Sequence, residues 1–191
     1  MGCVIRVFKF LLALTSPTDE NVPESLRQIS FQLLNTIVET QPQLIERIKP
    51  LRELLCDSLC KSMLNNLLTD NLDRLNLCMR LFFNLYVSLR KYVKVQLEVF
   101  FNNIMTYILK APSKYVLFEK QELVLEYLIQ FFYQPSFISD IFINYDCHLY
   151  CTNIFDTLTT YLYKVPFHSG ILFIFLFYFD IAKTIFYLGR I

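Results

Sequence analysis

The chain has 191 residues, of which 54% are hydrophobic and 18% are charged, and its formal net charge is +1. This length is enough for one domain with a substantial core, and the balanced charge argues against nucleic-acid binding. Only three glycines are present, which leaves few positions for the tight turns of a sheet protein, so we expect long helices.

Apolar residues recur at helical spacing along most of the chain, with breaks at Pro, Asn and Asp. A first helix is expected over residues 4–14, ending at Ser16-Pro17, and a second runs from Pro23-Glu24 to Gln41. The apolar residues that recur at helical spacing along this second helix are Leu26, Ile29, Leu33, Leu34 and Ile37. Further helices are expected from about Gln43 to Leu67 with a kink or division at Pro50, and then over 72–86, 93–109, 118–133, 136–143 and 147–163.

Helices of about fifteen to twenty residues joined by short loops are typical of stacked hairpins. The expected fold class is therefore all-α, an irregular armadillo- or HEAT-like α-solenoid. No repeat of fixed period is visible, so any repeats are irregular. A closed helical bundle is the alternative.

Six cysteines do not predict a disulfide framework here, because the first residues lack a cleavable signal pattern. Cys56 and Cys60 are four residues apart, as are Cys147 and Cys151, which would place each pair on one helix face as small apolar side chains. We therefore expect a reducing compartment, the cytosol.

The segment Asn144-Tyr145-Asp146-Cys147 marks a junction between two of the expected helices. Asp146 is well placed as the N-cap of a helix that begins near Cys147, since its carboxylate can accept from free backbone N–H groups. Asn144 is expected to tie the preceding loop.

The same four residues resemble the conserved box of a regulatory region, the homology-upstream domain. This domain lies before the catalytic domain in large guanine-nucleotide exchange factors for Arf GTPases, and the similarity is to the Golgi-specific brefeldin A-resistance type. Residues 10–17, 134–137 and 164–170 are also similar to segments of that family. Residues 1–170 are accordingly identified as part of such a domain.

This resemblance implies an α-solenoid that acts as a non-catalytic regulatory and protein-interaction fragment. The implied partners are the upstream dimerisation domain of the same factor and Golgi membrane proteins, with peripheral contact to the Golgi membrane from the cytoplasm. In such a factor nucleotide exchange depends on a separate domain with a catalytic glutamate, which no part of this chain matches. Asn144, Tyr145, Asp146 and Cys147 would be the interaction residues.

Other chemical sites are disfavoured by residue spacing. Cys147, His148 and Cys151 have metal-ligand types but not the paired knuckles of a structural zinc site. Two histidines offer no positioned partner for a nucleophile, and no glycine-rich phosphate loop exists. We expect no catalytic residues, no metal and no cofactor, and no enzyme activity for the chain alone.

The first residues of the chain and one basic cluster each allow more than one interpretation. Met1-Gly2-Cys3 is similar to an acylation start, but Arg6 stands where the myristoylation pattern requires Ser or Thr. Arg90, Lys91 and Lys94 form a cluster that is either a solvated loop or a contact for anionic lipid.

Residues 171–179 are purely apolar and aromatic, unlike the family, so 171–191 is set apart as a tail. A membrane span over 171–188 would include Asp180 and Lys183, which cost about 2.5–3.5 kcal/mol each near the bilayer centre. A truncated or mispredicted end that packs as a last helix is favoured. The alternatives to the family reading are a small membrane-anchored helical protein using this tail and an unrelated HEAT-type scaffold.

Overall fold

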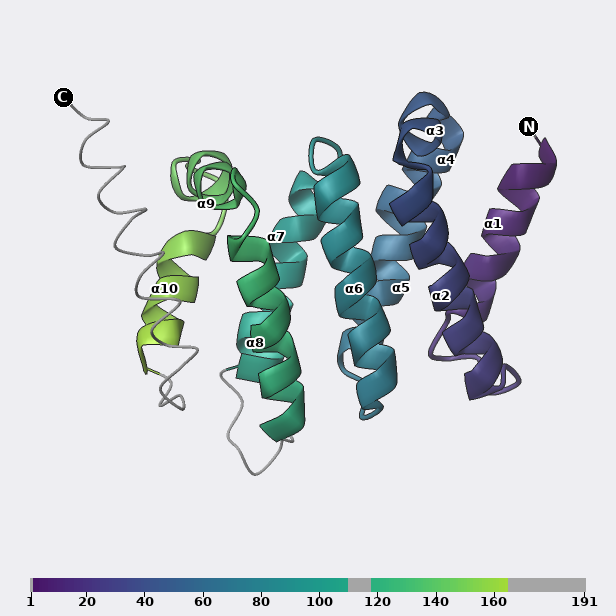
Figure 1. The fold of residues 1–191 in the computed structure, drawn as a ribbon, viewed down its shortest axis with the longest axis horizontal. Helices are drawn as coiled ribbons and strands as arrows, with labels where there is room; N and C mark the ends of the chain where they lie inside the picture. Colours follow the sequence, from purple (N-terminus) through teal and green to yellow (C-terminus); the bar gives the residue numbers. More distant parts are fainter. Residues whose placement is uncertain (1, 110–117, 165–191) are drawn as a thin grey trace. The chain divides into compact units, whose positions relative to one another are not determined.

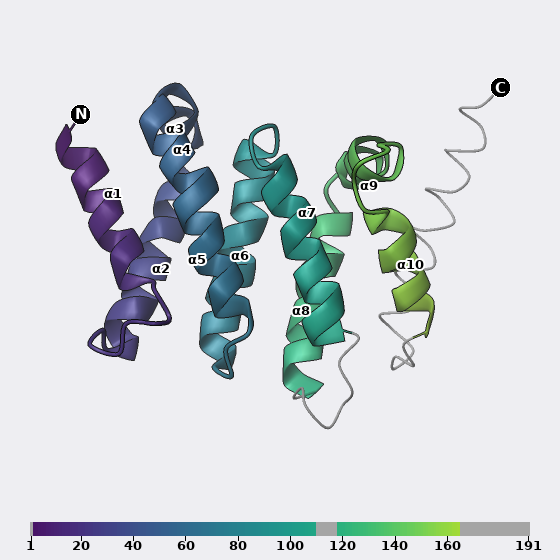
Figure 2. The same cartoon turned by 180° about the vertical axis from the view of Figure 1, so that it is seen from behind.

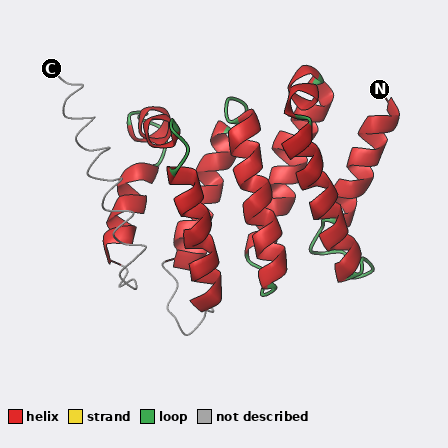
Figure 3. Cartoon of the chain, viewed as in Figure 1, coloured by secondary structure: helices red, strands yellow, loops and turns green. Residues whose placement is uncertain are grey.

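The computed structural model describes residues 2–109 and 118–164. Every regular element within these two ranges is helical (Figure 3), so the predicted all-α class is confirmed. The expected break at residues 111–113 and the apolar tail 171–191 lie outside the described residues. No helix within the described ranges is both long and apolar enough to cross a bilayer.

The chain divides into two compact units, residues 1–127 and 128–191. The first unit contains α1 (Gly2–Leu14), α2 (Glu24–Thr40), α3 (Pro42–Arg47), α4 (Lys49–Leu54), η1 (Leu55–Leu59), α5 (Cys60–Leu67), α6 (Leu72–Leu89), α7 (Lys94–Asn103) and η2 (Ile104–Leu109). α8 (Phe118–Phe132) begins in the first unit and ends in the second. The second unit continues with α9 (Phe137–Ile141), η3 (Phe142–Asp146) and α10 (Ile154–Lys164).

Helices of the first unit are stacked in two layers. α2 and α6 lie side by side in one layer, while α1, α5 and α7 form the other (Figures 1 and 2). α1 packs on α2 and α5 packs on α6, so each helical hairpin gives one helix to each layer. This arrangement is the stack of hairpins that the apolar spacing predicts.

The helix boundaries of the first unit follow from proline and from one side-chain cap. α1 ends at Leu14, before Pro17, and Pro42 occupies the first position of α3. The predicted division near Pro50 is confirmed, since α3 and α4 are separated at Ile48. At the start of α6 the Asn71 side chain accepts from the backbone N–H of Arg74 at 3.0 Å.

Apolar and aromatic side chains fill the space between the layers. Phe82 of α6 stacks on Phe100 of α7, and Phe101 meets Phe100 edge to face at 5.9 Å between ring centroids. Cys56 and Cys60 are buried, as predicted. Burial raises the pKa of the Cys56 thiol to about 11 and that of Cys60 to about 12, so both behave as small apolar groups.

The apolar residues that recur at helical spacing on α2 are mostly not its buried residues. Leu26, Ile29 and Leu33 are exposed and Ile37 is half-buried, so among the five only Leu34 lies in the core. The buried residues of this helix are Arg27, Ser30, Phe31, Leu34, Asn35 and Val38.

Polar residues on the buried face of α2 explain the difference, because each has a partner there. Asn84 of α6 donates its side-chain N–H to the amide oxygen of Asn35 at 2.8 Å. The Ser30 hydroxyl donates to the Leu26 carbonyl at 2.8 Å. Satisfied polar groups can be buried at little cost, so the helix is free to bury the face that carries Phe31.

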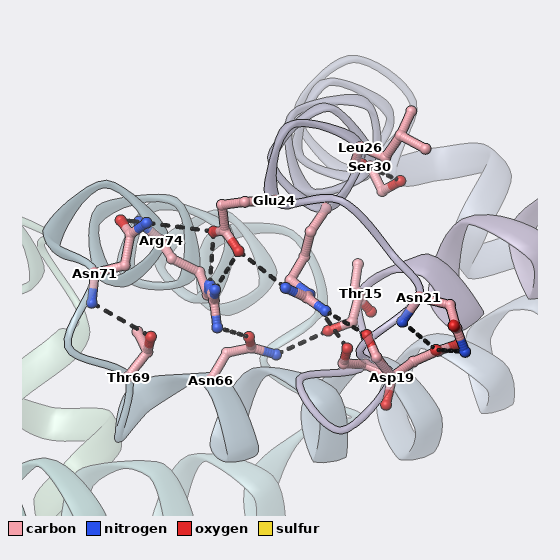
Figure 4. A network of polar contacts seen from close by, with 12 residues as sticks. Thr15, Asp19, Asn21, Glu24, Leu26, Ser30, Asn66, Thr69, Asn71 and Arg74 are labelled. Atoms are coloured by element: carbon pink, nitrogen blue, oxygen red, sulfur yellow. Dashed lines mark hydrogen bonds and ion pairs between the residues drawn. The ribbon is translucent and has the colours of Figure 1, made fainter.

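A network of charged and polar side chains joins the starts of α2 and α6 (Figure 4). Glu24 accepts from the Arg27 guanidinium at 2.9 Å and from Arg74 Nε at 2.9 Å. Arg74 Nη2 also forms an ion pair with the Glu24 carboxylate. The Asn71 amide also donates to Glu24, at 3.3 Å. The Arg74 and Arg27 contacts lower the pKa of the Glu24 carboxyl, with the Arg74 hydrogen bond the largest cause and burial opposing it.

The same network reaches the end of α1. Arg27 donates to the carbonyls of Ser16 at 3.2 Å and Asp19 at 3.0 Å, which fixes the loop between α1 and α2. The buried Asn66 amide of α5 donates to the Thr15 carbonyl at 2.9 Å. Segments far apart in the sequence are thus held together by a largely buried set of hydrogen bonds.

Candidate protein-interaction site

The last described helix begins later than the sequence suggested. A helix was expected over residues 147–163, but α10 covers Ile154–Lys164 and residues 147–153 form an exposed loop. Asn153, an N-cap residue type directly before Ile154, is the sequence signal for this helix start that the prediction missed.

Asp146 caps α10 across this loop rather than a helix next to it. One carboxylate oxygen accepts the backbone N–H of Phe155 at 3.0 Å, and the other accepts that of Asp156 at 3.0 Å. These are N–H groups of the first turn, which have no partner within the helix, and the negative charge suits the positive end of the helix dipole. The capping chemistry of Asp146 is therefore present, while the predicted position of the helix is wrong.

A π-helical turn leads into the cap. In η3 the Cys147 N–H bonds the Phe142 carbonyl at 2.9 Å, one residue further back than in an α-helix. Tyr145 is buried, and its carbonyl accepts the His148 N–H at 3.0 Å. Phe142 meets Phe155 of α10 edge to face at 6.0 Å. The turn and the helix are thus joined by an aromatic contact as well as by the cap.

The sequence suggested that Asn144 ties a loop, but the structure does not show this. It lies inside η3, and its side chain donates to the Asp140 carbonyl one turn earlier at 2.8 Å. Cys147 is exposed and Cys151 is half-buried, so the expected pair of thiols on one helix face is also wrong. Among the described side chains, no group of three His, Cys, Asp or Glu could hold a metal ion.

The exposed loop (residues 147–153) presents two side chains that the sequence analysis placed within a helix. Leu149 is 94% exposed and Tyr150 is 91% exposed. His148 turns back along the loop, where its Nδ1 lies 3.4 Å from the Tyr150 nitrogen and 3.5 Å from Cys151 Sγ. Leu149 and Tyr150 are an aliphatic and an aromatic group held away from the core, the kind of side chain found at protein contacts.

Residues 1–154 match the family model described as the Mon2/Sec7/BIG1-like HUS domain. The chain belongs to this HUS-domain family. The matched range includes the box residues 144–147 and ends at the first residue of α10.

Three curated relatives agree with this family. The chain is 30% identical over 171 residues to a Golgi-specific brefeldin A-resistance guanine nucleotide exchange factor 1 homolog of Caenorhabditis elegans, covering 87% of the chain and 9% of the relative. It is 28% identical over 179 residues to the ARF guanine-nucleotide exchange factor GNOM of Arabidopsis thaliana, covering 86% and 12%. Human brefeldin A-inhibited guanine nucleotide-exchange protein 1 is 27% identical over 137 residues, covering 72% and 7%. The HUS-domain chain therefore spans about a tenth of the length of these relatives.

Proposed function

We propose that this HUS-domain chain is a non-catalytic regulatory segment of a large Arf guanine-nucleotide exchange factor that acts in Golgi vesicle trafficking and coat recruitment. The observation that carries the proposal is the family match over residues 1–154. The names of the relatives, which are Arf exchange factors and a Golgi-specific factor, support it. Nucleotide exchange itself is assigned to a separate domain of the parent protein, and the location to the cytoplasmic face of Golgi membranes.

The contact surface assigned to this role is the exposed loop, which the box residue Asp146 holds in place. Asp146 accepts two N–H groups of α10 and so fixes both ends of the loop that carries Leu149 and Tyr150. The partner proposed is the dimerisation domain that precedes the HUS domain in such a factor. Burial of these two exposed side chains in the complex would provide the affinity, as aromatic anchors do in other interfaces.

A pull-down with the purified upstream domain of a Golgi brefeldin A-resistance factor tests this surface. The Leu149→Ala/Tyr150→Ala variant should lose binding about 30-fold or more, since truncating central anchors costs about 2 kcal/mol or more. Its stability should change by less than about 0.5 kcal/mol, because both side chains are exposed in the free protein.

Leu68→Ala/Tyr107→Ala is the matched control, because it truncates the same two residue types at other exposed positions. This control should bind like the unaltered chain. Equal binding by all three proteins would reject the loop as the contact, and no binding by any of them would reject the upstream domain as the partner.

A further inference from the structure

Basic side chains gather at one end of the first unit although the chain as a whole is nearly neutral. This basic end is formed by residues 44–53, which include α3 and α4, and by residues 87–95, where α6 passes into α7 (Figures 1 and 2). The two segments contain six basic and two acidic residues, a formal charge of +4, against +1 for the whole chain. The basic residues are Arg47, Lys49, Arg52, Arg90, Lys91 and Lys94. Glu98, one turn further along α7, reduces this charge to +3 if it is included.

The two segments of the basic end are joined by defined contacts. The Arg52 guanidinium lies over the Tyr92 ring at 4.3 Å from its centroid, and the Tyr92 hydroxyl donates to Glu46 at 3.3 Å. Arg52 also donates to the Glu46 carbonyl at 2.9 Å. These contacts hold α3, α4 and the loop between α6 and α7 together, so the charges form one surface.

The opposite end of the first unit has the opposite sign in its described loops. Five acids lie at this end. They belong to the loop between α1 and α2, to the loop between α5 and α6, and to the first residues of α2 and α6. Those acids are Asp19, Glu20, Glu24, Asp70 and Asp73. Among the described residues, Arg27 and Arg74 pair with Glu24, and Lys120 pairs with Asp70. An anionic surface would therefore attract the basic end and orient the unit.

Apolar side chains are interleaved with the cations at the basic end. Leu44 is exposed next to α3's basic residue Arg47, and Val95, 65% exposed, follows Lys94 at the start of α7. Tyr92 is also partly exposed between Lys91 and Val93. Basic groups beside exposed aliphatic and aromatic groups suit the interface of an anionic lipid bilayer, where the cations meet headgroups and the apolar groups enter the boundary layer.

We propose that the basic end is a docking surface for anionic lipid membranes. This surface consists of residues of the first unit, whereas the exposed loop belongs to the second, so the proposal goes beyond the protein contact described above. Binding should require anionic headgroups and weaken with salt, because exposed cations such as Arg47 and Lys91 would supply the attraction.

Vesicle co-sedimentation of the full 191-residue chain tests the proposal. Vesicles of phosphatidylcholine containing about 30 mol% phosphatidylserine should bind the chain at about 0.1 M salt, and binding should fall steeply at about 0.5 M. The Arg47→Glu/Lys91→Glu variant should lower the partition coefficient about 30-fold or more, because each cation contributes about a factor of five near such a surface.

A control variant with the same change in charge distinguishes binding at the basic end from a general effect of net charge. Lys9→Glu/Lys61→Glu changes the formal charge of the chain by the same amount at exposed positions of α1 and α5 outside the basic end. This control should lose less than about 3-fold if the basic end is the docking surface. Circular dichroism of both variants verifies that they fold.

Three results would overturn the proposal. An equal loss in both variants would show a general charge effect. Undiminished binding to pure phosphatidylcholine at high salt would assign membrane contact to apolar residues elsewhere in the chain. Binding to an acidic peptide such as poly-glutamate, with no binding to anionic vesicles, would make the partner a protein. None of these results affects the pull-down with the upstream domain.

Discussion

An acidic side chain holds the start of a helix in each unit, but the two acids have different neighbours. Glu24 of the first unit joins α2 to α6 through Arg74, which lies fifty residues away, and to its own helix through Arg27. Among the described residues, the Asp146 carboxylate of the second unit accepts from backbone N–H groups nine and ten residues further on. The first acid compensates buried cations, whereas the second shapes an exposed loop. Removing the first should therefore mainly affect stability, and removing the second should mainly affect binding.

The largest effect on stability is expected for Glu24→Ala. The Arg74 and Arg27 side chains are only 14% and 7% exposed, and this change would leave Arg74 without its ion-pair partner. We expect a loss of about 3 kcal/mol in the free energy of unfolding, at the low end for a broken buried pair because Glu24 is itself partly exposed. Urea denaturation measures the difference.

Glu39→Ala on the same helix is the control for this substitution. Glu39 pairs with Arg80 at 3.2 Å, and both side chains are about half exposed. Its loss should cost less than about 1 kcal/mol. Similar losses for the two variants would show that the network around Glu24 adds nothing beyond a surface ion pair.

A smaller loss is expected for Asp146→Ala. It removes the acceptors of two helix-start N–H groups, and such caps contribute about 1–2 kcal/mol. Asp146→Asn keeps one acceptor oxygen, so its stability should lie between that of the unaltered chain and that of Asp146→Ala. Thermal melting followed by circular dichroism checks the order, and a melting temperature that Asp146→Ala leaves unchanged would contradict the cap.

Asp146→Ala should also weaken binding to the upstream domain, even where the variant is fully folded. The reason is that the exposed loop would lose one of its fixed ends. Full binding by a folded Asp146→Ala protein would separate the cap from the contact surface.

The smallest expected effect is the pH dependence of the stability that Glu24 contributes. Its carboxyl has a lowered pKa in the folded chain, mainly because Arg74 donates to it. The stability that it contributes is therefore fully present above the ordinary value of 4.5 and is lost as the pH falls through the lowered pKa. The stability gap between the unaltered chain and Glu24→Ala should narrow between pH 7 and about pH 3.5. A constant gap over this range would show that the charge of Glu24 does not matter.

Much of the candidate site was accessible from the sequence. The run Asn144-Tyr145-Asp146-Cys147 indicated a helix junction, and an Asp at such a junction is a natural acceptor for helix-start N–H groups. The sequence did not reveal that the chain would first form a seven-residue loop, because a polar residue at a junction can cap the next helix from a distance. Leu149 and Tyr150 were consequently assigned to a helix, and their exposure became evident only in the folded chain.

The sequence by itself determined the helical class and most helix ends, because apolar periodicity and proline act over a few residues and need no distant partner. It could not decide which face of α2 is buried, since apolar side chains occur on both faces. Asn84 and Arg74 of α6 decided that question by supplying partners for Asn35 and for the Glu24–Arg27 pair. Burial of a polar face depends on hydrogen bonds from residues about fifty positions away, and only the tertiary structure brings those residues together.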